Sequence, residues 1–471
     1  MDFTYVEFPS TVNFNTFKAY YELHKCKLPN IHGKSLNYTE DLETNTNQIK
    51  TLRHLVLDTI LDNWSDNPIF KEIERQEDRN YILSNLNVNL PLKILSSYIQ
   101  DDFFWRKSYQ HRWKTLYYMS YTYQTQPPTI STFSPRASPT TTKPLQQQQY
   151  AVVKEKCKKT KPWINIYMER HLQEFIENLT TTDYDQERVQ ATLDICAMYI
   201  NQLEINYLQP SMDGQNDHIP LDFILRNLPE LHTLRLTYCT KTIGTHYYLG
   251  CNMLSRRDAS LLARGLQQCH ELVNFCLHNT KLEPYQLGLF AYSLDKGCHY
   301  LSALSLEHCS LGDEGIREFL SSCNKESFGT LKYLDLTNNK ITSEGAYYLS
   351  KVLKSLSLEK LILRLNPIGS EGAASIFGSL DDLPLTDLDM AGCSLDDTIT
   401  KLFMQLIIQN KTLWSIDISN NCLGQDFGKH LFKVIGFNKT LKYMNLRNTG
   451  LSLDKCKQFL EILKESHIKK K

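Results

Sequence analysis

Residues Gly424 to His430 have glycines and a lysine arranged much as in a phosphate-binding loop. The segment reads Gly-Gln-Asp-Phe-Gly-Lys-His. A true loop of this kind has one more residue between its glycines, and a Ser or Thr after the lysine to hold magnesium, where this chain has His430. The glycines also suit a simple turn from a loop into a helix. We therefore expect no nucleotide or other cofactor to bind there.

The histidines and cysteines follow no pattern typical of catalysis or metal binding. His111 and His171 each lie beside an arginine on an expected helix, without a plausible nucleophile. The chain has no H-E-x-x-H motif, no G-x-S-x-G motif and no kinase motif set. Its 13 cysteines are scattered without C-x-x-C pairs, so we expect neither a disulfide framework nor a zinc site. The sequence predicts a protein that is not an enzyme, with no catalytic, cofactor-binding or metal-binding residues.

The composition is ordinary for a soluble protein. Of 471 residues, 41% are hydrophobic and 22% are charged, and the formal net charge is +0. Such a balance provides no global field that would attract nucleic acid or an acidic membrane. The N-terminus lacks a basic segment followed by an apolar run, and no stretch approaches the roughly 18 apolar residues that span a bilayer. We expect a cytoplasmic protein that binds neither nucleic acid, membrane nor small molecules.

Leucine-rich repeats fill the second half of the chain. After a first interval of about 41 residues, which carries an insertion at 238–258, the repeats recur roughly every 27–30 residues. This period is typical of the ribonuclease-inhibitor subtype, in which each unit is a strand followed by a helix. The predicted fold is α/β, a leucine-rich repeat solenoid of horseshoe type preceded by an all-α N-terminal domain. The anchor L-x-x-L-x-L, with conservative replacements, begins at Leu231, Leu272, Leu301, Leu331, Leu358, Leu385, Leu413 and Leu441.

Each repeat also predicts how its turn and its helix are held. A small buried side chain that bonds turn backbone is expected after the strand, and both Asn and reduced Cys suit this position. Helices should begin where Ser or Asp can cap and Glu lies in the first turn. The turn positions are Asn339, Asn366, Asn421, Cys239, Cys309 and Cys393, and the helix starts are Asp313-Glu314-Gly315, Ser343-Glu344-Gly345 and Ser370-Glu371-Gly372.

The residues between the anchors should face outward on the concave side of the solenoid, the surface that such repeats use to bind proteins. Parallel strands lie about 4.8 Å apart, so Asp389 and Asp417 should be neighbours, with Asp387 nearby and Asp335 two strands away. This carboxylate stripe either receives Lys or Arg side chains of a partner or stays solvated. The candidate partner-binding residues of the concave face are Arg235, His278, Glu307, Asp335, Arg364, Asp387, Asp389, Asp417 and Arg447.

The region before the repeats reads as helices separated by polar segments. Helix starts are expected at Asn67-Pro68, Leu90-Pro91-Leu92 and Asp101-Asp102. The expected domains are an extended arm at 1–50, a helical domain at 51–120, a low-complexity linker at 121–160, a helical segment at 161–214 that caps the solenoid, and the repeat domain at 215–471 with a terminal cap helix at 454–464.

Two features of this N-terminal region have alternative interpretations. Trp105, Tyr109, Trp113 and Tyr117 recur every four residues and form an aromatic stripe along one expected helix. The stripe is either a core face or an exposed anchor for a partner helix, which makes Trp105 and Trp113 candidate binding residues. A lysine cluster at 154–161 either keeps the linker solvated or contacts an acidic tubulin surface or nucleic acid.

The motifs taken together resemble the leucine-rich repeat subunits of the nexin–dynein regulatory complex of motile cilia and flagella. The resemblance extends over about residues 50–455. The loop at 121–150 and the first 45 residues depart from it. The motifs that carry it are Asn67-Pro68-Ile69, Leu90-Pro91-Leu92, Asp101-Asp102 with Trp105, His111-Arg112-Trp113, Glu169-Arg170-His171-Leu172, the insertion in the first repeat interval, and Leu363-Arg364-Leu365-Asn366.

The resemblance implies a structural and regulatory subunit of the ciliary axoneme that helps bridge doublet microtubules and control dynein-driven sliding. Its implied partners are leucine-rich repeat and coiled-coil subunits of the same complex, with tubulin or dynein as further candidates. Two alternatives are a Ran GTPase-activating-like regulator of a small GTPase and a ubiquitin-ligase adaptor. More than 200 residues precede Leu231 and the chain ends in lysines, unlike the Ran regulators, and the N-terminal helices show no clear F-box pattern.

Overall fold

The computed structural model describes residues 50–66, 68–114, 161–211, 217–239, 252–322, 328–380 and 383–451. The expected arm at 1–49, the linker, most of the insertion, Tyr117 and the terminal helix at 454–464 lie outside these ranges. The chain divides into two units, Met1–Asn67 and Pro68–Lys471, and each is described by itself. Among the described residues, no helix combines the length and apolar character needed to traverse a lipid bilayer.

In the first unit, helix α2 spans Leu52–Asp62. The Thr51 hydroxyl caps it by accepting from the His54 amide at 3.4 Å. Leu52 and Val56 of this helix are largely exposed, at 78% and 51%, whereas Leu57 is buried.

The helix expected to begin at Pro68 is not formed. Pro68 lies in irregular chain, and helix α3 spans Gln76–Asn85. The preceding segment turns instead, and the Arg79 side chain donates to its Ile73 carbonyl at 2.5 Å. Proline fits an extended or turn segment as well as a first helical turn. The Asn-Pro pair alone therefore does not show where a helix begins.

The other two predicted helix starts are confirmed. Helix α4 spans Leu92–Tyr98 and follows Pro91 directly. Helix α5 spans Asp102–Trp113, and the Asp101 carboxylate caps it by accepting from the Phe104 amide at 3.0 Å. Helix α6 spans Trp163–Glu177 and helix α7 spans Gln186–Cys196, followed by the 3-10 helix η2 at Ala197–Tyr199.

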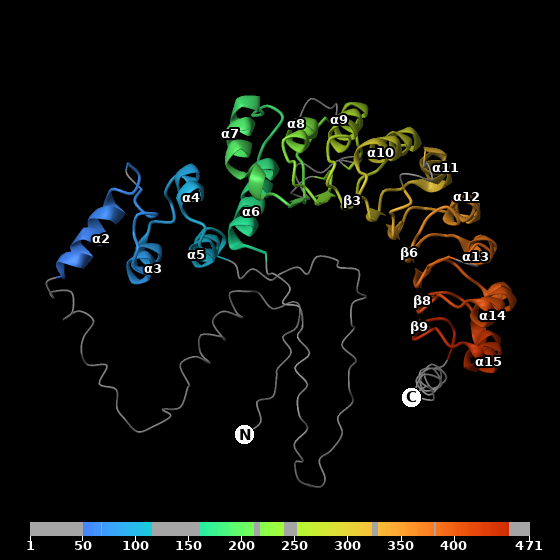
Figure 1. Ribbon diagram of the computed structural model, residues 1–471. Coiled ribbons are helices and arrows are strands. Elements are labelled where there is room, and N and C mark those ends of the chain that lie inside the picture. The colour runs from blue at the N-terminus through green and yellow to red at the C-terminus, as the bar shows by residue number, and fades with distance from the viewer. Residues whose placement is uncertain are drawn as a thin grey trace, which may run out of the picture. The chain divides into compact units, whose positions relative to one another are not determined.

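In the described part of the chain, the repeats form one parallel sheet of nine strands in chain order, β1 to β9. The helices α8 to α15 lie on the outer edge of the curved repeat region, and the strands line its inner edge (Figure 1). The leucine-rich repeat solenoid is therefore confirmed. The strands are β1 (Gln202–Ile205), β2 (Thr233–Leu236), β3 (Asn274–His278), β4 (Ala303–Glu307), β5 (Tyr333–Asp335), β6 (Lys360–Ile362), β7 (Asp387–Asp389), β8 (Ser415–Asp417) and β9 (Tyr443–Asn445).

The outer helices carry one apolar face toward the strands. Leu262 and Leu266 of α9, Leu349 of α12 and Ile376 of α13 are buried with the strand leucines. The helices are α8 (Leu221–Arg226), α9 (Arg256–Leu266), α10 (Pro284–Gly297), α11 (Gly312–Ser322), α12 (Ser343–Leu353), α13 (Gly369–Phe377), α14 (Thr400–Gln409) and α15 (Gly424–Val434), with short 3-10 helices η3 (Asp397–Ile399) and η4 (Ile435–Phe437).

The sheet begins one strand before the first predicted anchor at Leu231. Strand β1 pairs with β2 in parallel, with Leu203 opposite Leu234. Its sequence is Ile200-Asn-Gln-Leu203-Glu-Ile205, which fits the same anchor pattern with isoleucine in two positions. The segment at 202–205 therefore belongs to the repeat sheet and not to the helical cap.

The buried turn position forms a chain of hydrogen bonds from repeat to repeat, here called the asparagine ladder. Asn339 accepts from the Cys309 amide at 2.9 Å and donates to the Leu306 carbonyl at 2.6 Å. Asn366 accepts in turn from the Asn339 amide at 2.7 Å. Asn421 accepts from the Cys393 amide at 2.9 Å. The expectation that this side chain satisfies turn backbone is confirmed, and the bonds link each turn to its neighbour.

Cys309 and Cys393, two cysteines of the ladder, are free thiols. The Cys309 thiol donates to the Leu277 carbonyl at 3.3 Å, and the Cys393 thiol donates to the Leu363 carbonyl at 3.1 Å. Burial raises the pKa of both thiols to about 12, so both stay protonated at neutral pH.

Helix caps also come from neighbouring repeats. The expected cap residue Ser343 is the first residue of α12, and the hydroxyl of Thr342 caps this helix. The Asp313 carboxylate, from the preceding repeat, accepts from the Thr342 amide at 2.8 Å and the Gly345 amide at 3.0 Å. An aspartate at the start of one helix thus stabilises the start of the next.

Candidate protein-binding surface

The strand register places the predicted outward residues in one row across the sheet. Arg235 pairs with Cys276, Ser305 with Asp335, and Asp389 with Asp417. Asp335 and Asp389 both pair with Ile362, so they lie two strands apart, as expected. The row has two distinct parts, one at strands β1–β4 and one at strands β6–β9.

At strands β6–β9 a cation of the chain itself bridges two carboxylates of the predicted stripe. Arg364 donates to the Asp389 carboxylate at 2.6 Å and to the Asp417 carboxylate at 3.2 Å. Asn445 donates to Asp417 from the next strand at 2.8 Å. We call these four residues the Arg364 network. The sequence left open that Lys or Arg side chains of a partner bind these carboxylates. The Arg364 guanidinium occupies that place.

The aspartates of the row also hold the backbone that follows their own strands. The carboxylates of Asp335, Asp389 and Asp417 each accept from the amide two residues later, at 2.9, 3.0 and 2.9 Å. Asn445 does the same for the Arg447 amide at 3.2 Å. Such side-chain turns satisfy an amide at the end of the strand, which is a structural reason for Asp at this repeat position.

Burial changes the titration of two of these aspartates. It raises the pKa of Asp335, and bonds from Thr337 and Tyr333 oppose that rise. It also raises the pKa of Asp389, where the Arg364 guanidinium opposes the rise. Burial therefore disfavours the charged form of both carboxylates.

At strands β1–β4 the concave face is hollowed into a cavity of about 240 Å³, here called the β1–β4 cavity. Arg235, His278 and Glu307, three of the predicted candidates, come together there. Partial burial of the imidazole lowers the pKa of His278, and neighbouring Glu307 opposes the change. The remaining lining residues are Glu204, Ile205, Asn206, Leu236, Thr237 and Cys276.

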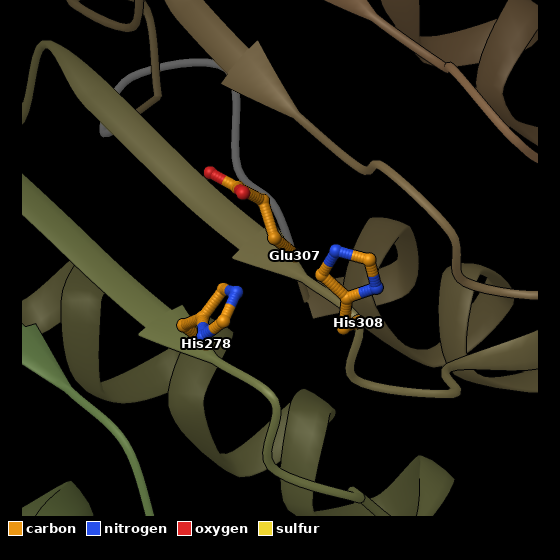
Figure 2. Close-up of side chains that lie close together, drawn as sticks. All are labelled: His278, Glu307 and His308. Carbon is orange, nitrogen blue, oxygen red and sulfur yellow. The ribbon is translucent and has the colours of Figure 1, made fainter. Parts of the chain in front are cut away.

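His278, Glu307 and His308 form a cluster beside this cavity, which the cysteine and histidine spacing did not reveal. One side-chain ligand atom from each residue lies within 4.8 Å of the others. Figure 2 shows the three side chains at the ends of two adjacent strands, β3 and β4. The available signal was the strand register, because His278 pairs directly with Glu307 and His308 follows it.

The other concave candidates are scattered around these two parts. The Asp387 carboxylate accepts from the Thr386 hydroxyl at 2.7 Å at the start of β7. Arg447 is exposed after β9. Neither belongs to the β1–β4 cavity.

The two tryptophan candidates have different environments. Trp105 is fully buried and donates to the Ile99 carbonyl at 2.8 Å, so it is a core residue. Trp113 is partly exposed, packs at a tilt against the rings of Tyr109 and Tyr167, and donates to the Glu174 carboxylate at 3.2 Å. Arg112 binds the same carboxylate at 2.8 Å. The stripe therefore joins α5 to α6, and of the two tryptophans only Trp113 is accessible to a partner.

Known proteins share both the repeats and the region before them. A family model described as Leucine Rich repeat matches residues 297–320, 330–350 and 354–377. Dynein regulatory complex subunit 5 of Mus musculus is 25% identical over 315 residues, covering 62% of this chain and 55% of that protein. Since residues 231–471 make up only about half of the chain, this similarity includes residues before Leu231.

The chain is a leucine-rich repeat protein similar to dynein regulatory complex subunit 5. The subunit of the same name from Chlamydomonas reinhardtii is 24% identical over 237 residues, covering 50% of this chain and 49% of that protein. This repeat protein thus spans about half the length of the curated relatives it matches. Ribonuclease inhibitor of Mus musculus is 31% identical over 131 residues, covering 26% of the chain and 28% of the inhibitor, in agreement with the expected repeat subtype.

Proposed function

We propose that the chain is a non-catalytic structural and regulatory subunit of the nexin–dynein regulatory complex in the axoneme of motile cilia. In this role it helps link adjacent doublet microtubules and regulate dynein-driven motility by docking to other proteins. The observation that carries the proposal is the similarity to dynein regulatory complex subunit 5, which continues beyond the repeats. Repeats alone are shared with proteins of other functions, such as ribonuclease inhibitor.

The partners we propose are other leucine-rich repeat and coiled-coil subunits of the complex, with tubulin and dynein as further candidates. A nine-stranded parallel sheet offers them an extended concave surface. Because Arg364 already bridges the two carboxylates of its network, we place the main charged contacts elsewhere on this surface, at the β1–β4 cavity and at exposed Arg447. Trp113 is a further contact candidate on the helical region.

Location and association can be tested in ciliated cells that lack the endogenous protein and express a tagged copy. We expect the tagged chain to stay on salt-extracted axonemes until the regulatory complex is released, and then to co-purify with its subunits. Recovery only from the soluble cytosol would refute the proposal.

The role of the concave face can be tested with two charge reversals of equal size. Arg447→Glu changes an exposed residue after β9, and Lys433→Glu changes an exposed residue on outer helix α15. We expect Arg447→Glu to reduce co-purification of partner subunits several-fold and Lys433→Glu to leave it unchanged. Equal behaviour of the two variants would contradict docking through this part of the concave face.

A further inference from the structure

We propose that His278, Glu307 and His308 form a zinc-binding site at the rim of the β1–β4 cavity. Two imidazoles and one carboxylate form a ligand set that zinc uses in proteins, with the fourth position left open. In this chain the three ligand atoms lie within 4.8 Å of one another. The inference does not depend on the proposed ciliary role.

The parallel sheet brings two of the ligands together. His278 ends β3 and Glu307 ends β4, and the two residues are direct register partners. Register partners on neighbouring parallel strands project to the same face about 4.8 Å apart, so their side chains rise together on the concave side. Figure 2 shows this arrangement, with His308 immediately after Glu307.

The turn after β4 positions the third ligand, His308. His308 has a φ of 59°, in the left-handed region, and the equivalent Asn279 and Asn338 have φ of 49° and 54°. In an extended strand the residue after Glu307 would point to the opposite face. The left-handed turn directs the His308 ring back toward its neighbours instead, and its ring centroid lies 5.3 Å from that of His278.

Neighbouring polar groups can hold the ligands in orientation. The Ser305 hydroxyl donates to Glu307 Oε1 at 2.8 Å, which leaves Oε2 for a metal. The Asn338 amide lies 2.7 Å from His308 Nδ1, which leaves Nε2 as the ligand atom. Zinc binding at Nε2 requires a proton on Nδ1, and a half-turn of the Asn338 amide presents an oxygen to accept it.

Closing the site around an ion requires only side-chain movement. Tetrahedral zinc with bonds of about 2.1 Å separates its ligand atoms by roughly 3.4 Å, so the cluster contracts by rotation of the side chains. His278 is exposed, and Glu307 and His308 are partly exposed, so these rotations meet little obstruction. The strands and their register stay in place.

The open coordination position faces an environment of mixed charge. His278 and Glu307 also line the β1–β4 cavity, together with Arg235 and Glu204. The Arg235 cation weakens metal binding, and the Glu204 carboxylate on the adjacent strand offsets it. Water or a histidine, cysteine or carboxylate of a docked protein can occupy the fourth position.

Zinc binding can be tested by calorimetric titration of the full chain with Zn²⁺ under reducing conditions. Because the chain also contains other histidines and 13 cysteines, the informative quantity is a difference between variants. The double variant His278→Ala/His308→Ala should lose one equivalent of its tightest zinc binding. The matched double variant His299→Ala/His430→Ala, at two exposed positions outside the cluster, should retain it. Identical titrations for wild type and the His278→Ala/His308→Ala variant would overturn the site.

Two further measurements test the site without the double variant. Glu307→Gln keeps the side-chain shape and should weaken zinc binding at least tenfold while leaving the circular dichroism spectrum unchanged. X-ray absorption of the chain loaded with one equivalent should show nitrogen and oxygen ligands. Sulfur in the first coordination sphere would assign the metal to cysteines and overturn the site.

Discussion

The charged residues make different contacts at the two ends of the concave face. At β6–β9, Arg364 bridges Asp389 and Asp417, and Asn445 completes the contact from the last strand. At β1–β4, Arg235, His278 and Glu307 surround a cavity, and two imidazoles meet a carboxylate at its rim. One end has its charges bound to each other, whereas the other presents side chains that can bind a ligand. A row of charged residues therefore identifies a surface without showing which part of it can receive a partner.

The largest expected difference between the two ends is in the free energy of unfolding that substitutions in the asparagine ladder remove. Asn421→Ala leaves the Cys393 and Leu395 amides without their acceptor and the Met390 carbonyl without a donor. We expect a loss of about 3 kcal/mol in the free energy of unfolding, since each buried unsatisfied group costs about 1–3 kcal/mol and neighbouring groups relax partly.

The matched change nearer the other end is Cys309→Ala, where a thiol, a weak donor, bonds the Leu277 carbonyl. Here we expect about 1 kcal/mol. Urea denaturation of both variants, followed by circular dichroism, measures the two losses. Equal losses would show that the Asn421 side-chain amide and the Cys309 thiol stabilise their turns equally.

The Arg364 network should give the next largest effect. Arg364→Met leaves the neighbouring carboxylates of Asp389 and Asp417 without their cation and should cost about 1 kcal/mol at pH 7, because Arg364 is partly exposed to screening solvent. Removing this cation raises the pKa of Asp389 further above its unfolded value. A raised carboxyl pKa favours the folded state at low pH, so the deficit should shrink as pH falls from 7 toward 4.

Denaturation midpoints of this variant across that pH range test the expectation. Lys429→Met is a suitable control, because Lys429 pairs with Asp426 on the exposed surface of one helix. Its effect should stay below about 0.5 kcal/mol and hardly change with pH. A deficit of Arg364→Met that grows on acidification would contradict the network as described.

A change of comparable size is expected in zinc affinity at the β1–β4 end. Asn338→Gly removes the amide beside His308 Nδ1 and keeps a residue that accepts the left-handed backbone conformation. Zinc affinity should fall about tenfold, the usual result of losing a group that orients a metal ligand. Asn448→Gly changes the equivalent turn position in the last described repeat, beside Asn420, and should leave zinc affinity unaltered.

The smallest effect is expected at Arg447. This exposed side chain lies outside the Arg364 network, and Arg447→Ala keeps the backbone amide that Asn445 binds. We expect a stability change below about 0.5 kcal/mol. A larger loss, measured by thermal unfolding, would show that Arg447 belongs to the network at its end of the sheet.

Much of the repeat architecture follows from the sequence because its rules are local and periodic. Alternation of anchors placed Asp389 beside Asp417, and the asparagine position predicted the buried turn contacts. Strand β1 was missed because its anchor begins with Ile200, whereas every anchor recognised in the sequence begins with leucine. The start at Pro68 was misplaced because proline suits a turn as well as a helix.

The candidate site was less accessible to sequence reasoning, because it depends on contacts between repeats. Arg364 contacts Asp417 two strands away. Predicting this contact requires the direction of a long side chain as well as the strand register. Asp313 caps the helix of the following repeat, although its own position in the sequence suggests a local cap. His308 joins His278 only through a left-handed turn, and residue spacing does not encode that rotation.

The asparagine ladder also limits how such a chain can lose or gain units during evolution. The amide of Cys309 needs the amide oxygen of Asn339, and the amide of Cys393 needs that of Asn421. A deletion that placed one cysteine unit directly before another would offer a thiol where an oxygen acceptor is required. Each of these two cysteine units is followed by an asparagine unit, so a recombination between repeats has to keep that order at the junction.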